Sequence, residues 1–236
     1  MVFLPGCAGF TIEDLLPPRV GLDEATVAAA LREALEVGTT RAAGTLSQPG
    51  GMGGDPRFRV RLPEEFDMAR TALRTVGLGS AVDDFEQTMN RAAETAAGEA
   101  VPVFAEAIAS MTIADAFGIL QGEEDAATRY FERATSAELH RRFQPVIRGA
   151  MNEVGAYAKY AELKRTYDAI PFTKPVVADL DTVLADRTLS ALFTVLAEEE
   201  ARIREDPVAR TSALMRKVFG SPEASASAAA APAPSP

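Results

Sequence analysis

The chain has 236 residues, 47% of them apolar, which is enough to bury one substantial core without disulfides or structural metals. Its formal net charge of -10 argues against nucleic acid as a partner, because binding to phosphates normally depends on clustered Lys and Arg. The single cysteine, Cys7, excludes an intrachain disulfide and a zinc site built from several thiolates.

Ala, Leu, Glu and Arg dominate the sequence and lose little on entering a helix, whereas alternation of β-branched residues is scarce. We therefore predict an all-α fold in residues 21–220, a single irregular bundle of about eight helices. No segment is repeated at a spacing of about 34 residues, so a solenoid is not expected. Residues 1–20 are expected to be a leader or linker, and the Ala/Pro/Ser-rich residues 221–236 a disordered tail.

The N-terminal residues Leu4, Pro5, Gly6 and Cys7 approximate the Leu-x-Gly-Cys pattern at which bacterial lipoprotein signals are cleaved and lipidated. A complete signal needs a basic region and an apolar stretch of roughly 7–15 residues, but only six residues without a positive side chain precede Cys7. A true start upstream would give a periplasmic or membrane-tethered protein, whereas a true start at Met1 would leave it cytoplasmic. No other segment approaches the roughly 18 consecutive apolar residues of a membrane span.

The first helix is predicted from about Glu24 to Leu46, with Asp23 able to cap its first turn. Its apolar stripe contains Val27, Leu31, Ala34 and Leu35. The helix ends at a glycine-rich segment, SQPGGMGGDPRFRVRLP, at residues 47–63.

The glycine-rich segment has three possible roles: a phosphate-binding loop, a mobile lid or a plain connector. A phosphate loop fits poorly, because no Lys-Ser or Lys-Thr pair follows the glycines and Pro56 removes an amide donor. We therefore expect a lid or a connector. Beyond it, charged and apolar residues alternate, which predicts a short extended piece with Phe58, Val60 and Leu62 on one side.

Two further helices are predicted at about 64–76 and 81–97, the second capped by Ser80 with Asp83. Pro102 is tolerated near the start of the helix that follows. Apolar residues recur at three-four spacing in all three, as in helices that pack against neighbours.

Three capping patterns are predicted in the middle of the chain: Thr112 with Asp115, Asp125 alone, and Thr135 with Glu138. The first would begin a short helix that ends near Gly122. The last would begin a helix to about Val154, which Pro145 is expected to bend or break. The remaining helices are predicted at about 157–169, 187–204 and 208–219.

The chain has a single histidine, His140. A metal site on helices would place His and carboxylates three or four residues apart on one face, and neither Glu-x-x-His nor His-Glu-x-x-His occurs here. We therefore expect a solvated helix residue, with no metal and no cofactor.

The run Glu198, Glu199 and Glu200 is the strongest acidic cluster. Successive helix positions point about 100° apart, so these carboxylates cannot act as one site without a second helix. We expect them to lie on a solvated face and to pair with Arg202 or Arg204. For a partly buried Glu200, the candidate cationic partners are Arg91, Arg133 and Arg210.

Asn90, Arg91 and Glu94 form a second polar group, beside the apolar stripe of the helix predicted at 81–97. Buried polar residues in a bundle must be paired. These three residues are therefore expected either to form a structural network that links helices or to form the polar end of a ligand pocket.

A pocket for a hydrophobic ligand is predicted because the chain has more aromatic and adaptable apolar residues than an Ala-rich bundle requires. For each residue, ordinary core packing is the alternative. The predicted apolar lining consists of Phe104, Ile108, Met111, Phe117, Phe131, Phe143, Met151, Phe193 and Leu196. The predicted polar lining consists of Arg91, Glu94, Tyr130, Arg133 and Glu200.

Three classes of function stay open. A carrier of a lipid or other hydrophobic small molecule needs an internal cavity, and a scaffold for other proteins needs an exposed apolar patch. An enzyme needs a cleft in which titratable groups converge, although no nucleophile motif or dinucleotide fingerprint occurs. The candidate groups for an enzyme are Arg91, Glu94, Asp125, Tyr130, Arg133 and Glu200. We favour the carrier, then the scaffold, and the oligomeric state is not predicted.

Three segments carry a family resemblance: NRAAE at 90–94, GILQGEEDAATRYFERATSAELHRRFQP at 118–145 and AEEEARIREDPVARTSALMRKVFG at 197–220. Together they resemble the bacterial domain of unknown function 4197 family, over roughly residues 21–220. The resemblance implies an all-helical envelope protein without an assigned enzyme activity, and by analogy a protein that handles lipids. Members commonly carry export signals, which favours the envelope over the cytoplasm.

Overall fold

The computed structural model describes residues 24–62, 66–153, 155–171, 179–206 and 208–220. These residues form nine helices and no strand, which confirms the all-α prediction. The helices are α1 (Glu24–Ser47), α2 (Asp67–Thr75), α3 (Gly79–Ala97), α4 (Ala100–Ser110), α5 (Ile113–Leu120), α6 (Ala126–Glu153), α7 (Ala156–Asp168), α8 (Leu180–Glu205) and α9 (Ala213–Phe219).

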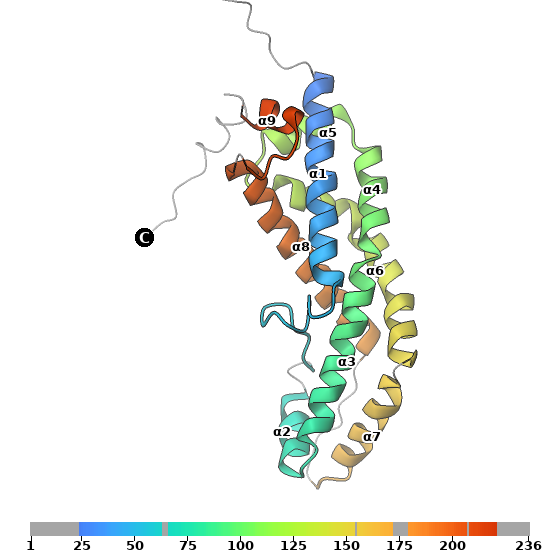
Figure 1. Ribbon diagram of the computed structural model, residues 1–236. Helices are drawn as coiled ribbons and strands as arrows, with labels where there is room; N and C mark the ends of the chain where they lie inside the picture. The colour runs from blue at the N-terminus through green and yellow to red at the C-terminus, as the bar shows by residue number, and fades with distance from the viewer. Residues whose placement is uncertain (1–23, 63–65, 154, 172–178, 207, 221–236) are drawn as a thin grey trace, which may run out of the picture.

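The helices form one elongated bundle (Figure 1), with α2 and α7 at one end and α5 and α9 at the other. The long helices α6 and α8 pack against each other, α3 packs on α6, and α1 packs on α8. Apolar stripes at helical spacing bring large side chains into this centre, where Phe85, Phe104, Phe131, Phe143 and Leu139 are fully buried. The bundle core is therefore continuous along its length.

Two local predictions are confirmed. The hydroxyl of Thr112 accepts a hydrogen bond from the amide of Asp115, whose carboxylate accepts one from the Thr112 amide, and α5 starts there. In the segment after the glycines, Phe58, Val60 and Leu62 are all buried, while the arginines between them are exposed. Both features depend on residues within a few positions of each other.

Two predicted caps are wrong. No side chain caps α3: the helix begins at Gly79, so Ser80 lies within its first turn, and Asp83 pairs with Arg74 of the preceding helix. Thr135 does not start a helix: α6 continues through it, and its hydroxyl donates 2.6 Å to the carbonyl of Phe131 within the helix. Helix α6 also continues through Pro145, so the proline does not break it.

The C-terminal helices differ in extent from their predictions. Helix α8 begins at Leu180, seven positions before the predicted start, because the Asp179 carboxylate accepts from the amide and hydroxyl of Thr182 at 3.3 and 2.8 Å. Helix α9 begins five positions after its predicted start, where the Ser212 hydroxyl accepts from the Met215 amide at 3.0 Å. The predicted cap Asp23 lies outside the described residues.

The capping carboxylates make the stability of the protein depend on pH. Hydrogen bonds from Thr112 lower the pKa of Asp115, and those from Thr182 lower the pKa of Asp179. Because the unfolded values lie near about 4, this stabilisation is present above about pH 4 and is lost as the pH falls through the lower folded-state values. Asp115→Asn is expected to shrink the difference in unfolding free energy between pH 7 and pH 3, measured by urea titration. Asp84→Asn, at an exposed side chain without a described hydrogen bond, is the control and should leave that difference unchanged.

No single helix among the described residues meets the length and hydropathy needed to cross a membrane. The stretch Gly79–Ser110 meets that test together with Ile113–Leu120, but the two are bent by 107°.

Candidate functional site

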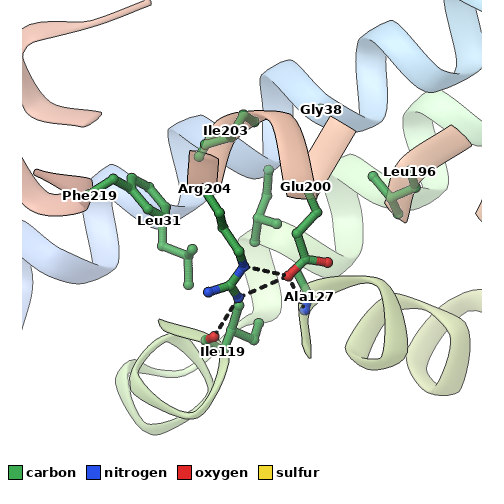
Figure 2. Close-up of a pocket in the computed structure, with 11 residues that line it drawn as sticks. Leu31, Gly38, Ile119, Ala127, Leu196, Glu200, Ile203, Arg204 and Phe219 are labelled. Atoms are coloured by element: carbon green, nitrogen blue, oxygen red, sulfur yellow. Dashed lines mark hydrogen bonds and ion pairs between the residues drawn. The ribbon is translucent and has the colours of Figure 1, made fainter. Parts of the chain in front are cut away.

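An apolar pocket lies between α1, α8 and α9 (Figure 2). Its volume is about 20 Å³, room for about one water. The lining residues are Leu31, Ala34, Leu35, Gly38, Ile119, Ala127, Leu196, Glu200, Ile203, Arg204 and Phe219. Apart from one ion pair, all of them present apolar surface or backbone. We call this the α1–α8–α9 pocket.

The ion pair in the pocket joins two residues one turn apart on α8. Arg204 donates from Nε and Nη2 to Oε1 of Glu200, at 3.2 and 2.9 Å, and Nη2 also donates to the carbonyl of Ile119 at 2.8 Å. Figure 2 shows the guanidinium between the Glu200 carboxylate and Ile119. The pair therefore ties the C-terminal part of α8 to the end of α5.

Glu200 also caps α6. One of its oxygens accepts from the Ala127 amide at 2.9 Å, and the other accepts from the amide and hydroxyl of Thr128 at 2.8 and 2.9 Å. Free amides at a helix start carry partial positive charge, so a carboxylate is stabilised there. The buried Glu200 is therefore a structural anion whose ligands lie on two helices.

The partner predicted for Glu200 is wrong. Neither Arg91 nor Arg133 reaches it, and Arg210 instead donates to the carbonyls of Ile203 and Arg204 at 3.0 and 2.6 Å. The solvated face predicted for the acidic run is wrong, because Glu199 and Glu200 are buried. The predicted pairing within the same helix is confirmed, since Glu200 pairs with Arg204 and Glu199 with Arg202.

The other two members of the acidic run face different neighbours. Glu199 is buried and pairs with Arg202 at 2.7 Å and with Arg41 of α1 at 3.6 Å. Glu198 is exposed and pairs with Arg57, next to the glycine-rich segment. The run therefore does not form one carboxylate site, as the helix geometry predicts.

The glycine-rich segment wraps around a second buried carboxylate. Oε1 of Glu94 on α3 accepts from the amides of Gly50, Met52 and Gly53 at 3.1, 3.2 and 3.1 Å. Successive amides that converge in this way form an anion-binding nest. The segment thus resembles a phosphate-binding loop in its backbone, but its anion is the protein's own side chain.

Two glycines in this turn are poor positions for a side chain, Gly51 because it has no room and Gly50 because of its backbone conformation. A Cβ at Gly51 would lie 2.3 Å from the Thr45 carbonyl oxygen, and Gly50 has φ +85°, which L-residues rarely adopt. Gly51→Ala is therefore expected to destabilise the protein by about 2 kcal/mol or more, measured by urea unfolding. Gly44→Ala in α1, where nothing lies within 4 Å, should instead stabilise it by about 0.5–1 kcal/mol. Equal effects at the two sites would contradict the tight approach at Gly51.

Asn90 holds the extended piece that follows the turn. Its side-chain carbonyl accepts from the Val60 amide at 2.8 Å, and its Nδ2 donates to the Val60 carbonyl at 2.8 Å. The buried side-chain amide of Asn90 thus pairs with both backbone groups of Val60, as a neighbouring strand would. Asn90 and Glu94 form a structural network, one of the two roles expected of them, but it joins α3 to a non-helical segment rather than to another helix.

A polar groove of about 740 Å³ runs along this network, between the glycine turn and α3. Arg91 lines it beside Glu94, and its exposed side chain makes no hydrogen bond or ion pair with the described residues. Asp83 and Asp84 also line the groove, so its charge is mixed. The groove favours no single class of ligand.

The predicted aromatic lining forms a cluster of rings. Phe104 makes edge-to-face contacts with Phe131 and Phe193, with ring centroids 5.3 and 6.4 Å apart, and Tyr130 packs edge-on against Phe131 at 5.6 Å. Burial raises the pKa of Tyr130 from an ordinary value that already lies well above neutral pH, so its hydroxyl is protonated near neutral pH.

Most of the other predicted lining residues pack in the core. Ile108, Met111, Phe143 and Met151 are buried, and Phe117 is half-buried. Of all predicted lining residues, the α1–α8–α9 pocket includes Leu196 and Glu200.

The remaining candidates lie apart from one another. His140 is half-buried, with Nε2 3.2 Å from Oδ1 of Asp186, and Asp125 pairs with Arg129 at 2.9 Å. Arg133 is exposed on α6. Among the described residues, no group of three or more His, Cys, Asp or Glu side chains could hold a metal ion. Cys7 lies outside the described residues, so its lipidation stays a prediction.

Sequence reasoning missed most of the α1–α8–α9 pocket. Gly38 and Phe219 were not assigned a role, although Gly38 continues the stripe of Leu31 and Leu35 at three-four spacing. On this face of the helix, a glycine without a side chain follows two leucines. The space that a side chain would fill is left open there, so a pocket can form. Phe219 carried no comparable signal.

A model of a protein family of unknown function, DUF4197, matches residues 21–220. The chain belongs to this family. No curated protein matches the chain, and no solved structure matches it. The DUF4197 match spans every described helix and both buried carboxylates, Glu94 and Glu200.

Proposed function

We propose that this DUF4197 protein is a non-catalytic helical protein that binds a hydrophobic small molecule or lipid in the α1–α8–α9 pocket. The observation that carries the proposal is the lining of that pocket, in which apolar side chains from five helices, α1, α5, α6, α8 and α9, surround a single ion pair. Hydrophobic ligands usually bind in such places between helices, with few polar groups to orient them.

A ligand larger than water needs more space than about 20 Å³, so one side of the pocket has to move. The side best suited to move is α9, which has seven residues and packs mainly on α1. It covers the pocket with Phe219, and Ser212 at its start donates to Glu33 of α1 at 2.9 Å. Displacement of α9 would leave an apolar groove between α1 and α8.

The placement of the polar candidates supports a non-catalytic role. Arg91 and Glu94 lie at the polar groove, Glu200 lies in the α1–α8–α9 pocket, and Tyr130 lies in the aromatic cluster. The carboxylates of Glu94 and Glu200 already accept hydrogen bonds from backbone amides. Catalysis instead requires titratable groups that converge on one reacting atom.

The test uses two glycine variants of α1. A methyl at Gly38 would meet Leu196 and Ile203 at 3.8 and 3.9 Å, an ordinary contact, so Gly38→Ala fills the pocket without a clash. Gly44→Ala is the matched control on the same helix, with nothing within 4 Å. The proteins are purified from their own host and studied by native mass spectrometry and lipid extraction. An apolar molecule should be bound to the wild type and to the control Gly44→Ala, and less of it should be bound to Gly38→Ala.

Three outcomes separate the alternatives. An apolar molecule lost in Gly38→Ala supports the proposal, and equal loading of both variants places the ligand elsewhere. A wild-type protein without any apolar molecule, but with a reproducible second protein or self-association, overturns the carrier in favour of a scaffold. The exposed apolar side chains Met68 and Val76 at the α2 end would then be the first surface to examine.

We place this function in the cell envelope, on the basis of the Leu4 to Cys7 pattern. Metabolic labelling with a fatty acid, compared with a Cys7→Ala variant, tests that location in the native host. Labelling that persists in the variant, or soluble cytoplasmic protein without label, contradicts a lipid tether at Cys7.

A further inference from the structure

Arg204 is the cation of the α1–α8–α9 pocket, and part of its guanidinium is uncommitted. Its Nε and Nη2 donate to Glu200 and to the Ile119 carbonyl. Its Nη1 makes no hydrogen bond with the residues that the structure describes. Figure 2 shows this third nitrogen, without a dashed line, on the side of Leu31. Two N–H donors of a pocket-lining guanidinium are therefore without a partner among the described residues.

The Glu200 carboxylate is shared between Arg204 and the start of α6. It balances the start of α6, a helix of 28 residues, by accepting from Ala127 and Thr128. A helix start is equivalent to roughly half a positive charge. One carboxylate therefore serves a full and a partial positive charge, while the Ile119 carbonyl, in the last turn of α5, supplies partial negative charge to the guanidinium.

We infer that the ligand of the α1–α8–α9 pocket is an amphiphile with a single carboxylate at the end of an apolar chain. Its carboxylate accepts a hydrogen bond from Nη1 of Arg204, and its chain lies along Leu31, Leu35 and Leu196. One open nitrogen suits a carboxylate better than a phosphate headgroup, which needs several donors. This inference rests on the proposed function and gives its ligand a chemical class.

The test compares hexadecanoic acid with hexadecan-1-ol, which differ only at the headgroup. Dissociation constants are measured by displacement of a fluorescent probe from the full-length wild-type protein at pH 7.4. We expect the acid to bind about tenfold more tightly than the alcohol, as for the gain of one charge-assisted hydrogen bond. Equal affinities for the acid and the alcohol would overturn the carboxylate inference and leave the proposed function standing. If neither the acid nor the alcohol binds, the proposed function itself is overturned.

Variants assign the difference to Arg204. The double variant Arg204→Met/Glu200→Gln removes both charges together, so no buried charge is left unpaired. It should lose the preference for the acid, so that the dissociation constants of the acid and the alcohol become about equal. Arg202→Met, at a neighbouring residue of α8 that pairs with Glu199 outside the pocket, is the control and should keep the preference. A preference that survives in the double variant contradicts a role for Arg204.

Discussion

Glu200→Ala is expected to lower the free energy of unfolding by about 3–5 kcal/mol, because it breaks a largely buried ion pair from one side. Arg204 is left without its carboxylate, and the amides of Ala127 and Thr128 lose their acceptor at the start of α6. Urea unfolding followed by circular dichroism at 222 nm measures the loss. An effect below about 1 kcal/mol would show that water replaces these contacts.

A double-mutant cycle separates the ion pair from the helix cap. Glu200→Gln keeps an oxygen for the α6 amides but removes the charge, so its cost should be smaller than that of Glu200→Ala. Combining Glu200→Ala with Arg204→Met should cost less than the sum of the single changes, because neither charge is then left alone. Additive costs would contradict a direct coupling between the two side chains.

Glu94→Ala is expected to cost about 2–4 kcal/mol, because it leaves three converging amides without an acceptor. The buried amide of Met52 loses most, since Gly50 and Gly53 can gain water. Hydrogen exchange at the Met52 amide should therefore accelerate by more than the loss of global stability, measured by urea unfolding, accounts for.

Two variants on the same helix calibrate this result. Glu94→Gln retains a side-chain oxygen for the nest and should cost less than Glu94→Ala. Arg91→Ala, at an exposed side chain without a described partner, should change stability by less than about 0.5 kcal/mol. Similar costs at Arg91 and Glu94 would argue against the nest as a source of stability.

Local features of the fold could be predicted from the sequence. The capping box of Thr112 with Asp115 needs only four consecutive residues, and the burial of Phe58 and Val60 follows from alternation. The same reasoning failed at Ser80 and Asp83, because α3 begins at Gly79 and Ser80 therefore lies inside its first turn, while Asp83 pairs with Arg74. A capping pattern of four residues does not by itself determine where a helix begins.

The roles of the two buried carboxylates could not be predicted. Glu94 binds amides 41 to 44 positions earlier, and Glu200 binds amides 72 and 73 positions earlier. Backbone amides are present at every residue except proline, so they leave no trace in the sequence. The sequence could indicate that Glu200 falls on an apolar stripe, but its partners depend on how the helices pack.

The long separation between the glycines and Glu94 also bears on synthesis. A growing chain leaves the ribosome from its N-terminus, so Gly50 to Gly53 emerge about forty residues ahead of the carboxylate that gathers their amides. Until α3 is complete, these glycines have no anion to organise them. The shape of the turn is therefore set by a helix that the chain has yet to make.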